Sequence, residues 1–226
     1  MTTDTEIGTT FAGLGVAPEL VEALESQGIR SPFPVQALTI EDALAGRDVC
    51  GKAKTGSGKT LAFGLPMLMR TPRAGPGAPR SLVLVPTREL AVQVAEVLEI
   101  LAKTVGRRVL AVYGGTDLDH QARQLAAGTD IVVATPGRLI DLADRKAVRL
   151  NKISTLVVDE AVGATLGAAE AQCLGRPCDD GGAHLRLVEL VHLQETVLHL
   201  VDGDLLGLYL VQDGVSEVSA DDLVDC

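Results

Sequence analysis

The fold class of this 226-residue chain is determined by one segment, Ala53-Lys54-Thr55-Gly56-Ser57-Gly58-Lys59-Thr60. A short apolar stretch over 48–50 precedes it and predicts a strand, and an apolar run over 60–69 follows it and predicts a helix. Glycines at 56 and 58 allow the backbone to turn its N–H groups inward, and the following helix adds the positive end of its dipole. A loop of this composition between a strand and a helix is typical of a phosphate-binding loop.

Four residues supply the chemistry that such a loop needs. We expect Lys59 to place its charge on the β- and γ-phosphates of a nucleotide, and the hydroxyl of Thr60 to ligate Mg²⁺. Asp159 ends a second apolar run, TLVVD over 155–159, and Glu160 follows it. An aspartate at this position can hold the metal partly through water, and the glutamate can orient or deprotonate an attacking water molecule. The sequence therefore predicts a Mg²⁺ and nucleotide site with Lys59, Asp159 and Glu160 as catalytic candidates.

Short apolar runs alternate with amphipathic segments over the first 161 residues. The runs over 48–50, 81–85, 109–113, 130–135 and 155–159 predict strands. The segments over 18–27, 34–45, 60–69, 88–103, 118–126 and 137–144 predict helices, and the Pro/Gly-rich stretch over 71–80 predicts a loop. This alternation indicates an α/β domain with a mostly parallel sheet that helices cover on both faces.

The nucleotide motifs together resemble the DEAD-box RNA helicases over residues 11–161. Phe11 lies 17 residues ahead of a segment, Gly28 to Gln36, that is similar to the adenine-recognising Q motif of that family. The resemblance implies a RecA-like P-loop fold in which the amide of Gln36 contacts the adenine edge, with Phe11 and Ile29 near the base. The residues that it implies for ATP binding are Phe11, Ile29, Gln36, Ala53, Lys54, Thr55, Gly56, Ser57, Gly58, Lys59 and Thr60.

Three further motifs resemble the RNA-contacting motifs of the same family. Each follows a predicted strand directly, so we expect all three at the carboxyl edge of the sheet. Hydroxyls, backbone N–H groups and guanidinium groups suit contacts to the sugar-phosphate backbone, which are independent of base sequence. The residues that the resemblance implies for RNA binding are Pro86, Thr87, Arg88, Gly114, Gly115, Thr135, Pro136, Gly137 and Arg138.

The resemblance ends after residue 161. The family's Asp-Glu-Ala-Asp box has Val162 at its fourth position here, and no Ser-Ala-Thr motif or second RecA-like domain follows in this sequence. Unwinding in the family requires two domains that close over ATP and RNA. We therefore divide the chain into a helicase domain over 1–161 and a divergent tail over 162–226. We expect this chain to bind Mg·ATP and RNA, with little hydrolysis or unwinding.

The tail differs from the domain in charge. Residues 1–160 hold 18 basic and 18 acidic residues, whereas 161–226 hold 2 basic and 12 acidic residues, so the whole net charge of −10 belongs to the tail. Stretches of strand-like composition over 185–193, 195–201, 205–211 and 216–219, with Asp-Gly turn dipeptides at 202–203 and 213–214, favour a β-meander. The three tail histidines, at 184, 192 and 199, are interpreted as ordinary surface residues.

The missing Ser-Ala-Thr strand leaves two structural alternatives. In RecA-like sheets that strand lies between the phosphate-loop strand and the Asp-Glu strand. Either the tail supplies a substitute strand or the domain is loosely folded, because each buried backbone group left unpaired costs about 1–3 kcal/mol. Two functional alternatives to a helicase fragment also stay open: a non-catalytic module that binds RNA or partners, and a truncated or frameshifted gene product.

Composition favours a soluble cytoplasmic protein. Hydrophobic residues make up 46% of the chain and charged residues 22%. No apolar run reaches the roughly 20 residues needed to cross a bilayer, and the first ten residues do not resemble a secretory signal. We expect the four cysteines to be free thiols and expect no membrane partner.

Overall fold

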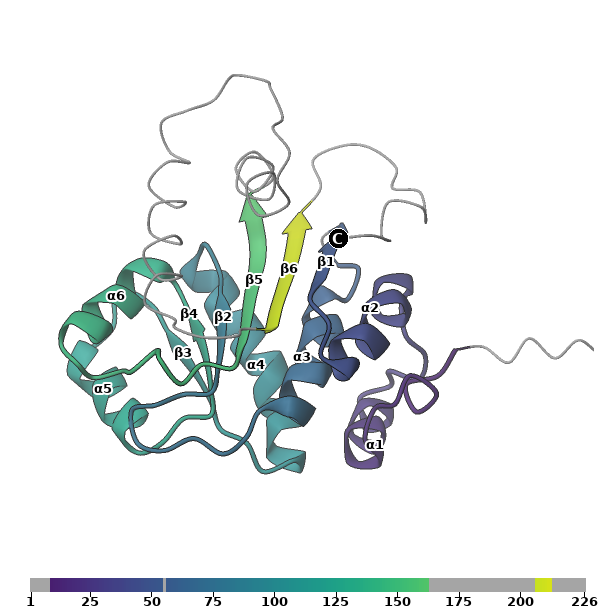
Figure 1. The fold of residues 1–226 in the computed structure, drawn as a ribbon, viewed down its shortest axis with the longest axis horizontal. Coiled ribbons are helices and arrows are strands. Elements are labelled where there is room, and N and C mark those ends of the chain that lie inside the picture. The colour runs from purple at the N-terminus through teal and green to yellow at the C-terminus, as the bar shows by residue number, and fades with distance from the viewer. Residues whose placement is uncertain (1–8, 55, 163–205, 213–226) are drawn as a thin grey trace, which may run out of the picture.

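The computed structural model describes residues 9–54, 56–162 and 206–212, and these form one parallel six-stranded sheet with helices on both faces (Figure 1). The strand order is β1-β6-β5-β2-β4-β3, and every neighbouring pair is parallel. The strands are β1 (Val49–Lys52), β2 (Ser81–Leu84), β3 (Val109–Val112), β4 (Ile131–Ala134), β5 (Thr155–Val162) and β6 (Leu206–Gln212).

All six predicted helices are present. They are α1 (Pro18–Ser26), α2 (Pro34–Ala45), α3 (Lys59–Arg70), α4 (Arg88–Thr104), α5 (Leu118–Ala126) and α6 (Pro136–Asp144). Three of them, α1, α2 and α6, begin with proline, which has no N–H to leave unpaired and has a φ angle suited to the first helical turn. The α/β class and the parallel sheet are confirmed. The largest difference in a predicted strand is in β5, which continues three residues beyond Asp159.

The sheet separates two hydrophobic cores. Along β2, Val83 packs in the core with α1, α3 and α4, whereas Leu82 and Leu84 pack in the core with α6. Successive side chains of a strand point to opposite faces, so a strand buried on both faces is apolar throughout. This explains why the central runs in the sequence are continuous and do not alternate with polar residues.

The tail contributes a central strand. Leu208 of β6 pairs with Val49 of β1 on one side and with Val157 of β5 on the other. Figure 1 shows β6 between these two strands, with all three arrows pointing the same way. The structure therefore agrees with the first of the two alternatives above: a strand from the tail takes the position of the absent Ser-Ala-Thr strand.

The β-meander interpretation is wrong for this strand. In a meander, β6 would pair antiparallel with a neighbouring tail strand, but both of its edges pair in parallel with β1 and β5. The local Asp-Gly turn signals did not predict this, because the pairing partners lie more than 40 residues away in the sequence. The other tail stretches, over 185–193, 195–201 and 216–219, and the three tail histidines lie outside the described residues.

β5 carries a bulge at its catalytic end. Asp159 pairs with Leu210 and Ala161 pairs with Val211, so Glu160 is an extra residue in the ladder. A bulge of this kind redirects the side chains that follow it and is common beside active sites.

Among the described helices, none is long and apolar enough to cross a membrane.

Candidate functional site: the carboxyl edge of the sheet

The phosphate loop connects β1 to α3 and has the backbone geometry that the sequence predicts. Gly56 and Gly58 have φ angles of +80° and +85°, a region that strongly favours glycine. Lys59 is the first residue of α3, and its Nζ donates a hydrogen bond of 2.8 Å to the carbonyl oxygen of Ala53. The ammonium group therefore lies against the loop, where its charge can meet a bound phosphate.

Gln36 joins the predicted Q motif to this loop. Its side-chain Nε2 donates to the carbonyl oxygen of Gly58 at 2.9 Å, and its Oε1 accepts from the backbone N–H of Phe33 at 2.8 Å. A Cβ added at Gly58 would lie 2.3 Å from Nε2 of Gln36, so no side chain fits there without movement. The glutamine thus positions the phosphate loop, and its amide is only 1% exposed.

One further observation indicates that this loop can hold a phosphate group. The hydroxyl oxygen Oγ of Ser57 is buried and has no hydrogen-bond partner among the described residues. A buried polar group without a partner is uncommon and often marks a position that a ligand fills. A phosphate oxygen could accept a hydrogen bond from this hydroxyl. Lys54 is exposed, and Thr55 lies outside the described residues.

Asp159 lies across the edge from the loop. It is 4% exposed and two residues after Val157, so regular alternation places its side chain on the same face as α3. One strand, β6, separates β5 from β1. Two strand spacings amount to about 10 Å, a gap that a hydrated metal ion and phosphate oxygens can bridge.

These residues also suit Mg²⁺. This ion usually keeps several waters and takes one or two protein oxygens together with substrate phosphates. Thr60 in the first turn of α3 and Asp159 on β5 offer such oxygens from the two sides of the gap. Within the described residues, no group of three or more His, Cys, Asp or Glu side chains forms a denser metal site.

The two apolar residues predicted to lie near the adenine belong to the larger core. Phe11 is 2% exposed, and Ile29 packs against the same cluster. Phe33, which the sequence reasoning did not select, is 55% exposed and lies beside Gly58 at the phosphate loop. Phe33 is therefore an exposed aromatic ring beside the phosphate loop.

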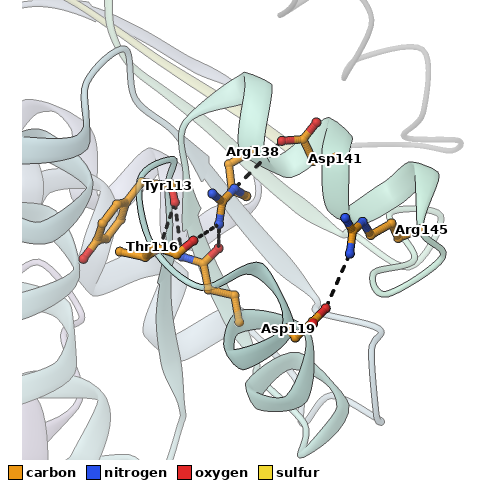
Figure 2. Close-up of polar contacts among 7 residues, drawn as sticks. Tyr113, Thr116, Asp119, Arg138, Asp141 and Arg145 are labelled. Atoms are coloured by element: carbon orange, nitrogen blue, oxygen red, sulfur yellow. Dashed lines mark hydrogen bonds and ion pairs between the residues drawn. The ribbon is translucent and has the colours of Figure 1, made fainter.

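A polar network joins two of the predicted RNA motifs (Figure 2). The Arg138 guanidinium Nη1 donates to the carbonyl oxygen of Thr116 and to Oε1 of Gln121, both at 3.0 Å. Gln121 in turn donates from Nε2 to the hydroxyl of Thr116 at 2.8 Å and to the carbonyl oxygen of Tyr113 at 3.2 Å. Arg138 is therefore largely committed to holding the loop after β3, and its side chain is only 11% exposed.

Arg88 is the more accessible guanidinium of the RNA motifs. It is exposed at the start of α4, and its guanidinium carbon lies 5.2 Å from the centre of the Tyr113 ring, a cation–π distance. A Cβ at Gly115 would lie 3.3 Å from Nη1 of Arg88, so the glycine leaves room for this side chain. The motifs after β2 and β3 thus meet at one place on the carboxyl edge.

Asp117 stabilises the helix that follows the Gly114-Gly115 loop. Its Oδ1 accepts hydrogen bonds from the backbone N–H groups of His120 at 3.2 Å and Asp119 at 2.9 Å, an N-cap for α5. These bonds, with the nearby charges of Arg123 and His120, lower the pKa of the Asp117 carboxyl below its ordinary value. The cap fixes the start of the helix that carries Gln121.

Sequence reasoning missed Gln121, Tyr113, Phe33 and Asp117. One of them left a readable signal: Gln121 stands on the inward face of α5, one turn before the buried Leu125, where the helical period predicts an apolar residue. A polar residue in that position needs buried partners. The remaining RNA-motif residues lie where the sequence placed them, directly after β2, β3 and β4.

Comparisons with known proteins agree with this arrangement. The family profile described as DEAD/DEAH box helicase matches residues 33–162, more than half of the chain. A DEAD-box ATP-dependent RNA helicase CshA from Bacillus cereus is 44% identical over 153 residues, which is 68% of this chain and 29% of the relative. The ATP-dependent RNA helicase DeaD from Escherichia coli is 51% identical over 158 residues, or 69% of this chain and 25% of the relative.

Solved structures agree as well. A DEAD box protein from Methanococcus jannaschii superimposes with a TM-score of 0.73 and 26% identity, covering 91% of this chain and 50% of that one. A hypothetical ATP-dependent RNA helicase from Sulfolobus tokodaii gives a TM-score of 0.67 and 29% identity, covering 86% and 50%. The chain spans less than a third of the length of the curated relatives reported above.

Proposed function

Because this chain belongs to the DEAD/DEAH box helicase family, we propose that it binds Mg·ATP and the backbone of RNA at the two halves of its carboxyl edge. The observation that carries the nucleotide part is the loop over 53–60. Its two left-handed glycines, the inward Lys59 and the unpartnered Ser57 hydroxyl together form a cradle for phosphate oxygens.

Nucleotide binding would use Lys59, Thr60 and Asp159 in different ways. Lys59 would give up its hydrogen bond to the carbonyl oxygen of Ala53 and bond the β- and γ-phosphates. A contact to a charged phosphate oxygen would then replace a contact to a neutral carbonyl oxygen. Thr60 and Asp159 would hold the metal, Asp159 partly through water. The metal, when bound, offsets the negative charge of the phosphates. Glu160, displaced by the bulge in β5, is the residue that we propose to orient water.

RNA binding would use the other half of the edge. We propose that Arg88, Thr87 and the exposed backbone of Gly114, Gly115 and Gly137 contact phosphates and sugars without reading bases. Arg138 and Pro136 would support this surface without contacting RNA directly. Arg138 holds the loop after β3, and Pro136 is buried in the first turn of α6.

Hydrolysis and unwinding are expected to be weak in this chain. Val162 occupies the position of the family's second box aspartate, and its partner in β6 is Gln212. The unwinding activity of the relatives belongs to proteins more than three times as long as the matched segment. We further propose a cytoplasmic location, since the curated relatives compared above are bacterial and the proposed ligand is RNA.

The nucleotide proposal is tested with Lys59→Ala. We expect the dissociation constant for Mg·ADP to rise at least about tenfold, equivalent to about 1.4 kcal/mol, because the charge that meets the phosphates is removed. Titration calorimetry measures this directly, and the rise in thermal midpoint on adding Mg·ADP should disappear in the same variant. Lys103→Ala, which removes an exposed lysine from the last turn of α4, is the matched control and should leave both readouts unchanged.

Two outcomes would contradict the proposal. Equal Mg·ADP affinity in Lys59→Ala and the wild type would mean that the loop over 53–60 does not hold the nucleotide. RNA binding by a wild type that binds no nucleotide would favour the alternative of a non-catalytic RNA-binding module.

A further inference from the structure

The opposite, amino edge of the sheet carries a strongly basic cavity. Its volume is about 280 Å³, and four of its lining residues are cationic: Arg73, Arg80, Arg149 and Lys152. Asn151 adds an amide, and none of the described lining residues is a carboxylate. Such a concentration of positive charge raises the local concentration of anions.

One of these side chains has a donor without a partner. The Nε–H group of Arg80 is buried and has no hydrogen-bond partner among the described residues. Arg80 directly precedes β2 and faces the cavity. A buried guanidinium donor of this kind is costly unless an acceptor reaches it. Because Arg80 is one of the residues that line the cavity, its guanidinium is the group that we expect a ligand oxygen to engage.

Backbone hydrogen bonds fix the walls of the cavity. The carbonyl oxygen of Arg80 accepts from the N–H of Ser154 at 2.8 Å, and the N–H of Arg149 donates to the carbonyl oxygen of Gly77 at 2.8 Å. Nη2 of Arg149 also donates to the carbonyl oxygen of Pro76 at 3.1 Å. The loop over 71–80 and the segment before β5 are therefore joined, and the backbone that carries Arg80 and Arg149 is held in place before any ligand arrives.

The nearby carboxylate does not neutralise the cavity. Asp130 is 2% exposed and accepts hydrogen bonds from the backbone N–H groups of Ala74 at 2.7 Å and Arg108 at 2.8 Å. Its ion pair with Arg73 has an N–O distance of 3.6 Å, and the Arg73 side chain is 62% exposed. Arg73 thus keeps most of its donors for a ligand.

We propose that this cavity binds a phosphate group of the RNA backbone, as a second contact distinct from the carboxyl edge. The proposal rests on the RNA binding proposed above. Guanidinium groups match the geometry of phosphate oxygens, and their charge-assisted hydrogen bonds are stronger than neutral ones. Arg80 precedes β2 and Pro86 follows it, so the two contact regions lie about 20 Å apart at about 3.3 Å per strand residue.

The test compares two double variants in RNA-binding titrations. Arg73→Gln with Lys152→Gln removes two exposed charges of the cavity and leaves its backbone hydrogen bonds intact. Arg47→Gln with Arg145→Gln removes two charges of similar exposure, 61% each, that lie outside the cavity and the RNA motifs. Each protein is titrated with a short labelled single-stranded RNA between about 50 and about 200 mM salt.

We expect the cavity variant to bind RNA about tenfold more weakly at the lower salt concentration. The slope of log affinity against log salt should shrink by about 0.7, because the loss of one phosphate contact removes about that much on a single strand. The control variant should keep the wild-type slope. Arg73→Lys with Lys152→Arg, which retains both charges, should restore it.

The outcomes separate this inference from the proposed function. A wild type that binds no RNA overturns both. A wild type that binds RNA, with equal slopes in the cavity and control variants, overturns the second contact alone. A cavity variant with a lower thermal midpoint and an unchanged slope would mean that the chain's own acidic residues occupy the cavity, which also overturns the inference.

Discussion

The two halves of the carboxyl edge are built differently. In the RNA half, after β2, β4 and β3, polar side chains are held by one another: Arg138 bonds Thr116 and Gln121, and Gln121 bonds the loop behind Tyr113 (Figure 2). In the nucleotide half, between β1 and β5, Gln36 supports the loop through the carbonyl oxygen of Gly58. The groups that would meet a phosphate are less engaged: among the described residues, Lys59 bonds a carbonyl oxygen of its own loop and the Ser57 hydroxyl has no partner.

The difference follows from what each half is proposed to hold. A polynucleotide backbone passes over a surface, so the loops that meet it can be fixed in advance by an internal network. A nucleotide phosphate enters the loop itself, and the polar groups that receive it must stay available. The nucleotide half also depends on β6, since that strand alone separates the phosphate loop from Asp159 in the sheet.

The largest effect is expected from a proline in β6. Leu208→Pro removes a backbone N–H from a strand that is paired on both sides, and its ring disturbs the ladder. The buried carbonyl that loses its donor costs about 1–3 kcal/mol, and the clash of the ring adds to this, so we expect a loss that is a large part of a total stability of about 5–15 kcal/mol. Chemical denaturation should show a lower midpoint or no cooperative transition, and the Mg·ADP response should be lost with it.

Leu208→Ile is the control for this change, because it keeps the N–H and a strand-forming side chain. If Leu208→Pro unfolds at the wild-type midpoint and still responds to Mg·ADP, the nucleotide half does not depend on β6.

An intermediate effect is expected in the RNA half. Arg138→Ala leaves Oε1 of Gln121 and the carbonyl oxygen of Thr116 without their shared donor, which should cost about 1–3 kcal/mol of unfolding free energy. RNA affinity should fall as well, because the loop after β3 loses its support, whereas Mg·ADP affinity should be unchanged. Denaturant titration and RNA titration measure the two effects.

Arg145→Ala is the matched control for Arg138→Ala. Arg145 forms an exposed ion pair with Asp119 at 3.4 Å, visible beside the network in Figure 2. Exposed pairs contribute about 0–1 kcal/mol, so this variant should be nearly as stable as the wild type. Equal losses in the two variants would show that the network is no stronger than a surface ion pair.

The smallest effect is expected at Asp117 and depends on pH. Backbone N–H bonds from His120 and Asp119 lower the pKa of this carboxyl in the folded state, so its charge contributes stability above the unfolded pKa of about 3.9. That contribution is lost as the pH falls through the lower, folded pKa. Asp117→Asn keeps the cap without the charge.

Thermal midpoints of the two proteins should therefore differ at neutral pH, with the wild type higher, and converge as the pH falls below about 3.9. A difference that stays constant over this range would mean that the charge of Asp117 does not strengthen the N-cap of α5.

Much of the fold could be predicted from the chain's local patterns. The apolar runs gave the strands β1 to β5 to within a few residues, because strands buried on both faces have a continuous apolar signature. The helices followed from the periodicity of their apolar residues. The order of motifs along the chain also predicted that the nucleotide and RNA residues would share one edge, since parallel strands end at the same side.

The candidate site was less predictable in its side-chain roles. Phe11 has the right spacing for the Q motif, but tertiary packing places it in the core, whereas Phe33 is exposed beside the loop. Arg138 was expected on the RNA surface, but its Nη1 donates to Thr116 and Gln121 and its side chain is only 11% exposed. Sequence spacing fixes the backbone position of a residue, while its side-chain partners depend on residues distant in sequence.

The sequence by itself determined the class of the domain, the phosphate loop and the sharp change in charge at residue 161, because these depend on local composition and order. Only the tertiary structure decided where the tail strand belongs. Residues 206–212 have the composition of any buried strand, and their neighbours suggested a meander. In the structure these residues form the strand between β1 and β5. A strand in that position pairs the backbone groups of both neighbours and so completes two ladders of hydrogen bonds at once.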